Sequence, residues 1–363
     1  MNILLLSPYD AASHRYWHQG LMHHLREQHI TLVTLPPRYF SWRFRGNSLS
    51  LAFDPRLAGD WDLLLATSMT DLSALRGMRP NLATTPCLLY FHENQFAYPE
   101  QGARTHLVER QITSLYAALS ADQLLFNSAF NRRTFLDGVA TLLGRLPDLV
   151  PAGLVARLSA RARVLPVPLW PDCFATHVPQ PATATTTGAA APLAIVWNHR
   201  WEYDKGVAAL QLLVTALLAS GLDFVLHLIG QSFRQIPVPL QQVIADLQQA
   251  GRLGECGYIA ARADYLALLR RCQVVLSTAE HEFQGIAVLE AVAAGCLPLV
   301  PDALAYQDFI PDQWRYADQD QAVQMLLALA AQWQAGALPK APAQSHLSWH
   351  AQLPAWQELL ASA

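Results

Sequence analysis

The sequence has few cysteines and no pair of them spaced as C-x-x-C. Its 363 residues include 5 cysteines, scattered at positions 87, 173, 256, 272 and 296. This scatter argues against a zinc ribbon and a disulfide framework, and it favours a reducing compartment.

The sequence also lacks a strong charge of either sign and a long apolar run. Charged residues make up 15% of the chain and the net charge is −3, which argues against a protein that coats nucleic acid non-specifically but allows a local basic patch. The apolar run at residues 3–6 has no basic segment ahead of it and is too short for a signal peptide or a membrane span. We therefore expect a cytoplasmic protein without a membrane partner.

The chain is rich in apolar residues, which make up 52% of it and occur in short runs that alternate with helical patterns. In the first half we expect strands at residues 2–7, 30–35, 61–66, 87–91, 123–126 and 163–167, with helices at 14–28, 72–78 and 105–120. In the second half we expect strands at 193–197, 223–229, 257–258, 273–276 and 297–301, with helices at 207–219, 240–250, 262–270, 320–334 and 349–360. Alternating strands and helices predict parallel sheets covered on both faces, an α/β class.

A segment rich in Thr, Ala and Pro separates these two halves. Residues 175–192 show no apolar periodicity and have the composition of a linker. We predict an N-terminal domain at 1–174, a second domain at 193–340, and a C-terminal helix at 341–363 that packs on the N-terminal domain. Two doubly wound, Rossmann-like domains would face a cleft, with ligands at the carboxyl ends of the strands.

The stretch at residues 277–296 is the one around which the second half is organised. It reads as a loop and then a helix after a short strand, with Glu282 before and Glu290 within the helix. A helix that begins between Gln284 and Ile286 would point its free N–H groups at the loop, which suits a diphosphate. The two carboxylates would then lie at opposite ends of one elongated ligand.

A second loop, after the strand at 193–197, contains Arg200 and Lys205. Two fixed cations there would hold a diphosphate and stabilise it as it leaves. The alternative is a solvated loop in which these cations pair with Glu202 and Asp204. Gly230 ends a neighbouring strand and either lies near the same ligand or only forms a turn.

In the first half, His92 and Glu93 follow a strand end, where an open α/β sheet presents ligands. A histidine there binds a sugar hydroxyl or orients the acceptor, or alternatively it is a hydrogen-bonded part of the core. Trp42 lies among Arg38, Arg43 and Arg45, and such interleaving suits phosphate contact with base stacking on a single-stranded loop, although it is also common on amphipathic surfaces.

Arg200-x4-Lys205 followed by Glu282-Phe-x-Gly285-x4-Glu290 resembles the donor-site signature of retaining GT-B glycosyltransferases. The resemblance implies that Arg200 and Lys205 hold the donor diphosphate, that Glu282 faces the transferred sugar and that Glu290 binds the ribose. It further implies that the backbone near Gly285 and Ile286 contacts phosphate. Tyr258 would lie beside the nucleotide base, unless it is packed in the core.

Four further motifs resemble one branch, the tRNA-queuosine α-mannosyltransferases: Pro36-Pro-Arg38-Tyr-Phe-Ser-Trp42-Arg43-Phe-Arg45, Leu89-Tyr-Phe-His92-Glu93-Asn94-Gln95, Phe126-Asn127-Ser128-Ala-Phe130-Asn131 and Trp197-x-His199-Arg200-Trp201-Glu202-x-Asp204-Lys205. This resemblance implies transfer of mannose from GDP-mannose to the cyclopentenediol of queuosine in tRNA, with tRNA-Asp as the expected substrate and no metal cofactor. It makes His92, Glu282, Arg200 and Lys205 the catalytic candidates. The acceptor-binding candidates are Ser13, His14, Arg43, Arg45, Glu93, Asn94 and Gln95.

The first loop departs from the family pattern. It reads Asp10-Ala11-Ala12-Ser13-His14, where the family typically has Gly-Gly-Ser-His, and two methyl groups restrict close backbone approach. Two alternatives to the preferred function remain: a GT-B enzyme with a lipid-linked or surface glycan acceptor, and a non-catalytic tRNA- or nucleotide-binding protein.

Two metal-site patterns are rejected. Asp318-Gln-Asp320 is far in sequence from the donor motifs, and His14 and His18 lack a third ligand.

Overall fold

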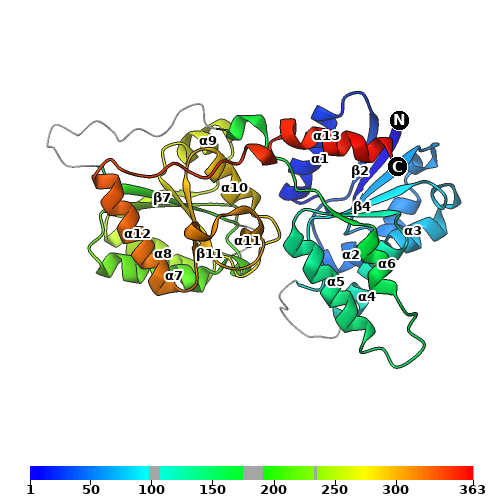
Figure 1. Cartoon of the computed structure of the whole chain (residues 1–363), viewed down its shortest axis with the longest axis horizontal. Coiled ribbons are helices and arrows are strands. Elements are labelled where there is room, and N and C mark those ends of the chain that lie inside the picture. The colour runs from blue at the N-terminus through cyan, green and yellow to red at the C-terminus, as the bar shows by residue number, and fades with distance from the viewer. Residues whose placement is uncertain (98–106, 175–190, 233–234, 363) are drawn as a thin grey trace. The chain divides into compact units, whose positions relative to one another are not determined.

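The computed structural model describes residues 1–97, 107–174, 191–232 and 235–362. The chain forms two compact units, unit 1 from Met1–Pro168 with Trp349–Ala363 and unit 2 from Leu169–Ser348 (Figure 1). The division lies ahead of the boundary predicted at residue 174, because Leu169 donates its N–H to the carbonyl of Leu347 within unit 2. The predicted linker lies outside the described residues as far as residue 190.

Unit 1 contains a six-stranded sheet of order β2-β1-β3-β4-β5-β6, and every strand pairing in it is parallel. The strands are β1 Asn2–Ser7, β2 His29–Thr34, β3 Leu63–Thr67, β4 Cys87–Phe91, β5 Gln123–Phe126 and β6 Ala162–Val164. The helices are α1 Ala12–His24, α2 Phe40–Ala52, α3 Leu72–Met78, α4 Leu107–Leu119, α5 Ala129–Leu143, α6 Leu154–Ala160 and α13 Trp349–Ala361, with short turns η1 Pro55–Ala58 and η2 Pro80–Leu82.

The central strands of unit 1 are buried along their whole length, as their apolar sequences require. All five residues of β3 and of β4 are buried, and their side chains form one core with those of the covering helices. The last helix of the chain, α13, belongs to this unit and packs on α1 (Figure 1). Its Trp349 ring stacks on His24 at 4.6 Å and Trp356 lies 6.1 Å from Trp17.

Unit 2 repeats this design with a parallel sheet of order β12-β11-β10-β7-β8-β9. Its strands are β7 Leu193–Asn198, β8 Phe224–Ile229, β9 Leu253–Gly257, β10 Val274–Leu276, β11 Leu297–Pro301 and β12 Arg315–Tyr316. Its helices are α7 Val207–Ala219, α8 Val238–Gln249, α9 Arg262–Leu269, α10 Ile286–Ala293, α11 Tyr306–Phe309 and α12 Gln319–Gln334, with turns η4 Pro171–Cys173, η5 Tyr203–Lys205, η6 Asp312–Trp314 and η7 Ser345–Leu347.

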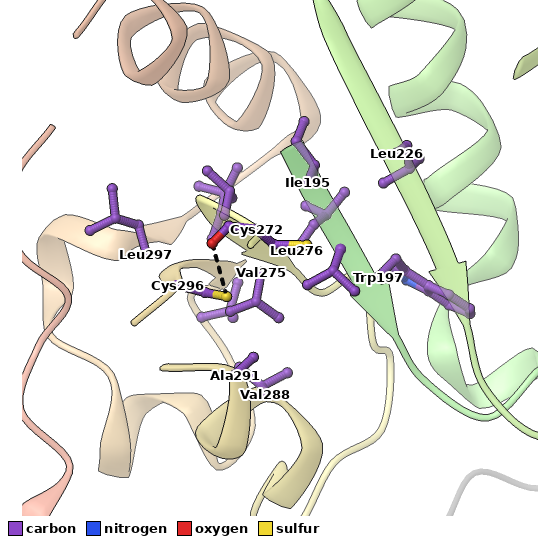
Figure 2. Packing of buried hydrophobic residues seen from close by; sticks show 14 of the residues in the cluster. Ile195, Trp197, Leu226, Cys272, Val275, Leu276, Val288, Ala291, Cys296 and Leu297 are labelled. Atoms are coloured by element: carbon purple, nitrogen blue, oxygen red, sulfur yellow. Dashed lines mark hydrogen bonds between the residues drawn. The ribbon is translucent and has the colours of Figure 1, made fainter. Parts of the chain in front are cut away.

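The core of unit 2 fixes β7, β10 and α10 against one another. Figure 2 shows Ile195 of β7, Val275 of β10 and Val288 of α10 among the buried side chains of one cluster. Cys296, directly before β11, donates its S–H to the carbonyl oxygens of Leu269 and Cys272. All five cysteines are free thiols. The loops that follow β7 and β10 therefore extend from a rigid support.

Four helices and one strand of the structure were not predicted: α2, α5, α6, α11 and β12. The predicted strand at 257–258 is wrong in position, because β9 ends at Gly257. The predicted helix at 14–28 is also displaced, since α1 ends at His24. For the predicted helix at 105–120, residues 105 and 106 lie outside the described residues. None of the described helices is long and apolar enough to cross a membrane.

Candidate active site

The carboxyl ends of β7 and β10 lie side by side in the sheet of unit 2. β7 pairs with β10 on one side and β8 on the other, so this is the point at which the strand order changes direction. Open α/β sheets bind ligands at such points. The loop after β7 contains Arg200 and Lys205, and the loop after β10 contains Glu282.

Helix α10 begins directly after this second loop. Gly285 precedes its first residue with φ 80°, a left-handed conformation that favours glycine, and none of the described side chains caps this end. The first turn of a helix carries free N–H groups and the positive end of the helix dipole. The predicted start of the helix between Gln284 and Ile286 is confirmed, since α10 begins at Ile286, and its geometry suits an anion.

Lys205 connects the two loops. Its Nζ donates to the carbonyl oxygen of His281 at 2.9 Å and to Oε2 of Glu282 at 3.1 Å. It also lies 3.3 Å from Oδ2 of Asp204. The Lys205 side chain is only 8% exposed, so its position is fixed by these partners.

This lysine decides the charge of Glu282. Burial acts to raise the pKa of the carboxyl group, but the charge of Lys205, with a smaller effect from His199, lowers that pKa to about 2. The other oxygen, Oε1, accepts the backbone N–H of Phe283 at 3.1 Å. Glu282 is therefore an ionised carboxylate with a fixed orientation at neutral pH.

Arg200 is the more accessible cation of the pair. Its guanidinium contacts Glu202 at 2.8 Å and Asp204 at 3.4 Å, as the solvated-loop alternative predicted, and its side chain is 44% exposed. The pair with Glu202 is exposed and contributes little to stability, whereas Asp204 is a buried partner. Binding of a phosphate by Arg200 in place of Glu202 stays a prediction.

Glu290, in the second turn of α10, is 5% exposed and is held by three side chains of unit 2. Its Oε1 accepts from Nη2 of Arg262 at 2.9 Å and from the thiol of Cys173 at 3.2 Å. Its Oε2 accepts from the hydroxyl of Tyr265 at 3.2 Å. Neither Arg262 nor Tyr265 was predicted as a site residue, because each lies in an ordinary amphipathic helix far in sequence from Glu290.

His199, directly before Arg200, was also not predicted as a site residue. It is buried, and its pKa is lowered to about 3 by burial and then by Lys205, so the ring is neutral. Its Nε2 has no hydrogen-bond partner in the part of the chain that the structure describes. Its position directly after a strand end could have identified it, because His92 was predicted as a site residue on the same ground.

Gly230 and Tyr258 directly follow the neighbouring strands β8 and β9. A methyl group on Gly230 would lie 1.7 Å from the carbonyl oxygen of His199, so this glycine permits close contact with the loop that contains the cations. Tyr258 is 66% exposed, so the alternative that it is packed in the core is wrong. Contact between Tyr258 and a nucleotide base stays a prediction.

In unit 1, the side chains that follow β1 and β4 form a polar cluster. Nε2 of His14 lies 3.3 Å from Oε2 of Glu93, and its Nδ1 lies 3.4 Å from the hydroxyl of Ser7. The His14 ring stacks on His92 at 4.2 Å, and Trp17 packs edge-on against His92 at 4.9 Å. The structure thus brings three predicted site residues, His14, His92 and Glu93, into one place.

His92 is neutral in this cluster. Burial lowers its pKa well below the ordinary value, and the nearby His14 and His18 act in the same direction. Its Nε2 has no hydrogen-bond partner among the described residues. Nε2 of His18 lies 2.9 Å from Oδ1 of Asp10, so this side chain is bound to the first loop.

Asn94 is occupied within the fold. Its amide N–H groups donate to Asn131 and Thr134, and its oxygen accepts the backbone N–H groups of Phe96 and Ala97. These bonds show that Asn94 shapes the loop after β4, and its binding of a substrate hydroxyl stays a prediction.

Gln95 and Ser13 complete the predicted acceptor set in unit 1. Gln95 is buried and Ser13 is exposed. Ala11, in the position of a family glycine, has φ −66°, so its methyl group causes no backbone strain.

The predicted basic patch lies on α2. Trp42 is 53% exposed, and Arg43 is half-buried in the next position. The Arg45 side chain is 65% exposed and forms an ion pair with the buried carboxylate of Asp71. Arg38 lies over the ring of Tyr39, which is itself exposed.

The Asp318-Gln-Asp320 pattern has a structural role. Oδ1 of Asp318 accepts the N–H of Gln321 at 2.8 Å and caps α12. Among the described residues, no group of three or more histidines, cysteines or acids is arranged to hold a metal ion.

Comparison with known proteins gives the family. The family model described as tRNA-queuosine alpha-mannosyltransferase N-terminal matches residues 2–169. A Drosophila melanogaster protein named tRNA-queuosine alpha-mannosyltransferase is 30% identical over 322 residues, which cover 87% of this chain and 83% of the fly protein. The chain belongs to the tRNA-queuosine alpha-mannosyltransferase family.

Solved structures show that this family member has the GT-B fold. Anabaena HepE, solved with UDP and glucose, matches with a TM-score of 0.70 at 14% identity and full coverage of both chains. Sucrose-phosphate synthase from Thermosynechococcus elongatus matches with a TM-score of 0.67 at 15% identity, again over both whole chains. The predicted fold class is therefore confirmed.

Proposed function

We propose that the protein is a retaining glycosyltransferase that moves mannose from GDP-mannose onto the cyclopentenediol of queuosine in tRNA. One observation carries the proposal: in a chain of this family, Lys205 fixes an ionised Glu282 beside the open start of α10. Cations and a helix N-terminus suit a departing diphosphate, and a fixed carboxylate beside them suits the sugar hydroxyls.

On the donor side, the leaving group determines the chemistry. As the bond between sugar and phosphate loosens, negative charge develops on the nucleoside diphosphate. Arg200, Lys205 and the N–H groups at the start of α10 stabilise this charge, and preorganised charges are most effective where water is excluded. We propose that no metal is required, because these groups supply the positive charge that a metal ion would supply elsewhere.

On the acceptor side, Glu93 and the histidines of unit 1 are the proposed contacts. The carboxylate of Glu93 is partly exposed and positioned by His14, so it accepts hydrogen bonds from acceptor hydroxyls. Neutral His92 offers a ring nitrogen to the transferred sugar. The acceptor hydroxyl attacks the same face of the sugar that the diphosphate leaves, and passes its proton to the leaving phosphate.

Contact with RNA is assigned to the exposed residues of α2 and the loop before it. Trp42 and Tyr39 have exposed aromatic rings, Arg45 is exposed and Arg43 is half-buried. Unpaired bases stack on aromatic side chains while cations bind the phosphates. We propose the anticodon loop of a queuosine-containing tRNA, such as tRNA-Asp, as the substrate.

Nucleotide binding tests the donor assignment. Thermal unfolding is measured with GDP and with UDP at equal concentrations, since a ligand that binds the native state raises the melting temperature. We expect stabilisation by GDP and none by UDP, and Glu290→Ala should abolish it. Stabilisation by UDP alone would refute the guanine assignment.

A further inference from the structure

The carboxylate of Glu290 is held by a network of hydrogen-bonded side chains that no single sequence motif contains. It runs from Asp172 in η4 through Arg262 in α9 to Glu290, and from Glu290 through Tyr265 in α9 to Asn198 of β7. All five residues belong to unit 2. The hydrogen bonds in this network show which residue orients which neighbour.

Asp172 fixes the plane of the Arg262 guanidinium. Nε of Arg262 donates to Oδ2 of Asp172 at 2.7 Å and Nη2 donates to Oδ1 at 2.8 Å. Such a parallel pair of bonds fixes orientation as well as distance. Nη2 then reaches Oε1 of Glu290 at 2.9 Å, so the orientation of Arg262 sets the orientation of Glu290.

Tyr265 holds the other oxygen of the same carboxylate. Its hydroxyl donates to Oε2 of Glu290 at 3.2 Å and accepts from Nδ2 of Asn198 at 3.2 Å. Nδ2 of Asn198 also donates to the carbonyl of Ala287 in α10, at 2.8 Å. The end of β7 is thereby connected to Tyr265 and to the first turn of α10.

Glu290 keeps capacity for a further donor. An ionised carboxylate offers about four lone-pair sites, of which the structure fills three, from Arg262, Cys173 and Tyr265. Burial, followed by the proximity of Glu290, raises the pKa of Tyr265 well above its usual value, so its hydroxyl stays a donor. The remaining site is on Oε2, which suits a hydroxyl group.

We propose that Arg262 and Tyr265 are positioning residues that hold the Glu290 carboxylate in the orientation that accepts a ribose hydroxyl of the nucleotide donor. This inference rests on the proposed function, in which Glu290 binds the ribose. Arg262 acts through Glu290 and not by contact with the nucleotide. A lysine in its place lacks the planar fork and cannot satisfy Asp172 and Glu290 in the same way.

Titration of each variant with GDP and with 2′,3′-dideoxy-GDP tests the proposal, because the second ligand lacks both ribose hydroxyls. We expect Arg262→Ala to bind GDP about tenfold more weakly than the wild type, the loss that follows from misplacing one hydrogen bond to a charged group. The same variant should bind the dideoxy nucleotide as the wild type does. Tyr265→Phe should show the same selectivity with a smaller loss, and it is the second test if Arg262→Ala does not fold.

Arg270→Ala is the matched control. Arg270 also contacts Asp172, through the backbone oxygen at 2.5 Å, but no bond joins it to Glu290 in the described part of unit 2. Its removal should leave both affinities unchanged. In a Glu290→Gln background, Arg262→Ala should cause no further loss of GDP affinity.

Equal loss of both nucleotides in Arg262→Ala, or a further loss in the Glu290→Gln background, would overturn the positioning role. If UDP binds and GDP does not, the same series with UDP and dideoxy-UDP applies, so a wrong base assignment does not decide the test. If Glu290→Gln leaves the wild-type affinity unchanged, the proposed function of Glu290 fails and the inference fails with it.

Discussion

Lys205→Met is the perturbation that most directly tests the electrostatic design of the donor site. It removes the cation but keeps most of the side-chain volume, and it leaves the partly buried carboxylate of Glu282 hydrogen-bonded to the backbone N–H of Phe283. In the intact protein the pKa of Glu282 is lowered from 4.5 to about 2. At about 1.4 kcal/mol for each pKa unit, the ionised carboxylate contributes about 3 kcal/mol to folding at neutral pH.

The variant should therefore lose about 3 kcal/mol of stability at pH 7, comparable with the loss seen when one partner of a buried pair is removed. The sign of the pH dependence follows from the direction of the pKa. A lowered pKa stabilises the fold above the unfolded value of 4.5 and is lost as the pH falls through about 2. The difference between wild type and variant should thus narrow between these two pH values.

Urea unfolding of the full chain at pH 7 and at pH 3 measures both effects. The double variant Lys205→Met/Glu282→Gln is the control, because it removes the uncompensated charge and should recover most of the stability. If Lys205→Met is as stable as the wild type at pH 7, or if the double variant is no more stable than the single one, the reasoning is wrong.

Three further predictions concern other parts of the molecule. Lowering the pH from 7 to 5 should destabilise the wild type by about 2 kcal/mol relative to His199→Asn, because His199 has a pKa of about 3 in the folded state and 6.5 in the unfolded state, so only the unfolded state is protonated in this range. Melting temperatures of both proteins at the two pH values test this, and an equal change in both would contradict it. Gly230→Ala should lose at least about 3 kcal/mol because its methyl group would overlap a carbonyl oxygen, whereas Gly77→Ala, with open space around it, should be neutral or slightly stabilising in the same denaturation assay. Arg43→Ala/Arg45→Ala should weaken tRNA binding and reduce its salt dependence while donor hydrolysis is unchanged; unchanged tRNA affinity in a filter-binding assay would remove α2 from the account.

The apolar runs predicted the two sheets well because buried parallel strands must be continuously apolar. β1, β4, β5 and β11 have the predicted bounds. Helix α2 was not predicted because its sequence mixes serine, arginine and aromatic residues without a clear apolar face. The start of α5 was equally hidden in a motif, although Ser128 accepts the N–H of Asn131 as an N-cap.

The sequence motifs predicted Lys205 and Glu282 but not Arg262, which holds Glu290. Lys205 and Glu282 were recognised by spacing, and the structure adds that they form one ion pair. Arg262 lies 28 residues before Glu290 in the chain, and no local pattern connects them. Contacts of this kind depend on tertiary packing, in which Asn198 at the end of β7 bonds both Tyr265 of α9 and Ala287 of α10, and a single sequence does not specify them.

Mass spectrometry of nucleosides from treated tRNA tests the central claim most directly. Queuosine-containing tRNA is incubated with the protein and GDP-mannose, and in parallel with UDP-glucose, UDP-galactose or no donor. We predict that the queuosine signal is replaced by one heavier by a single hexose only with GDP-mannose, and that Lys205→Met abolishes this product. An unchanged queuosine signal with every donor, or a hexose found on tRNA that lacks queuosine, would contradict the account.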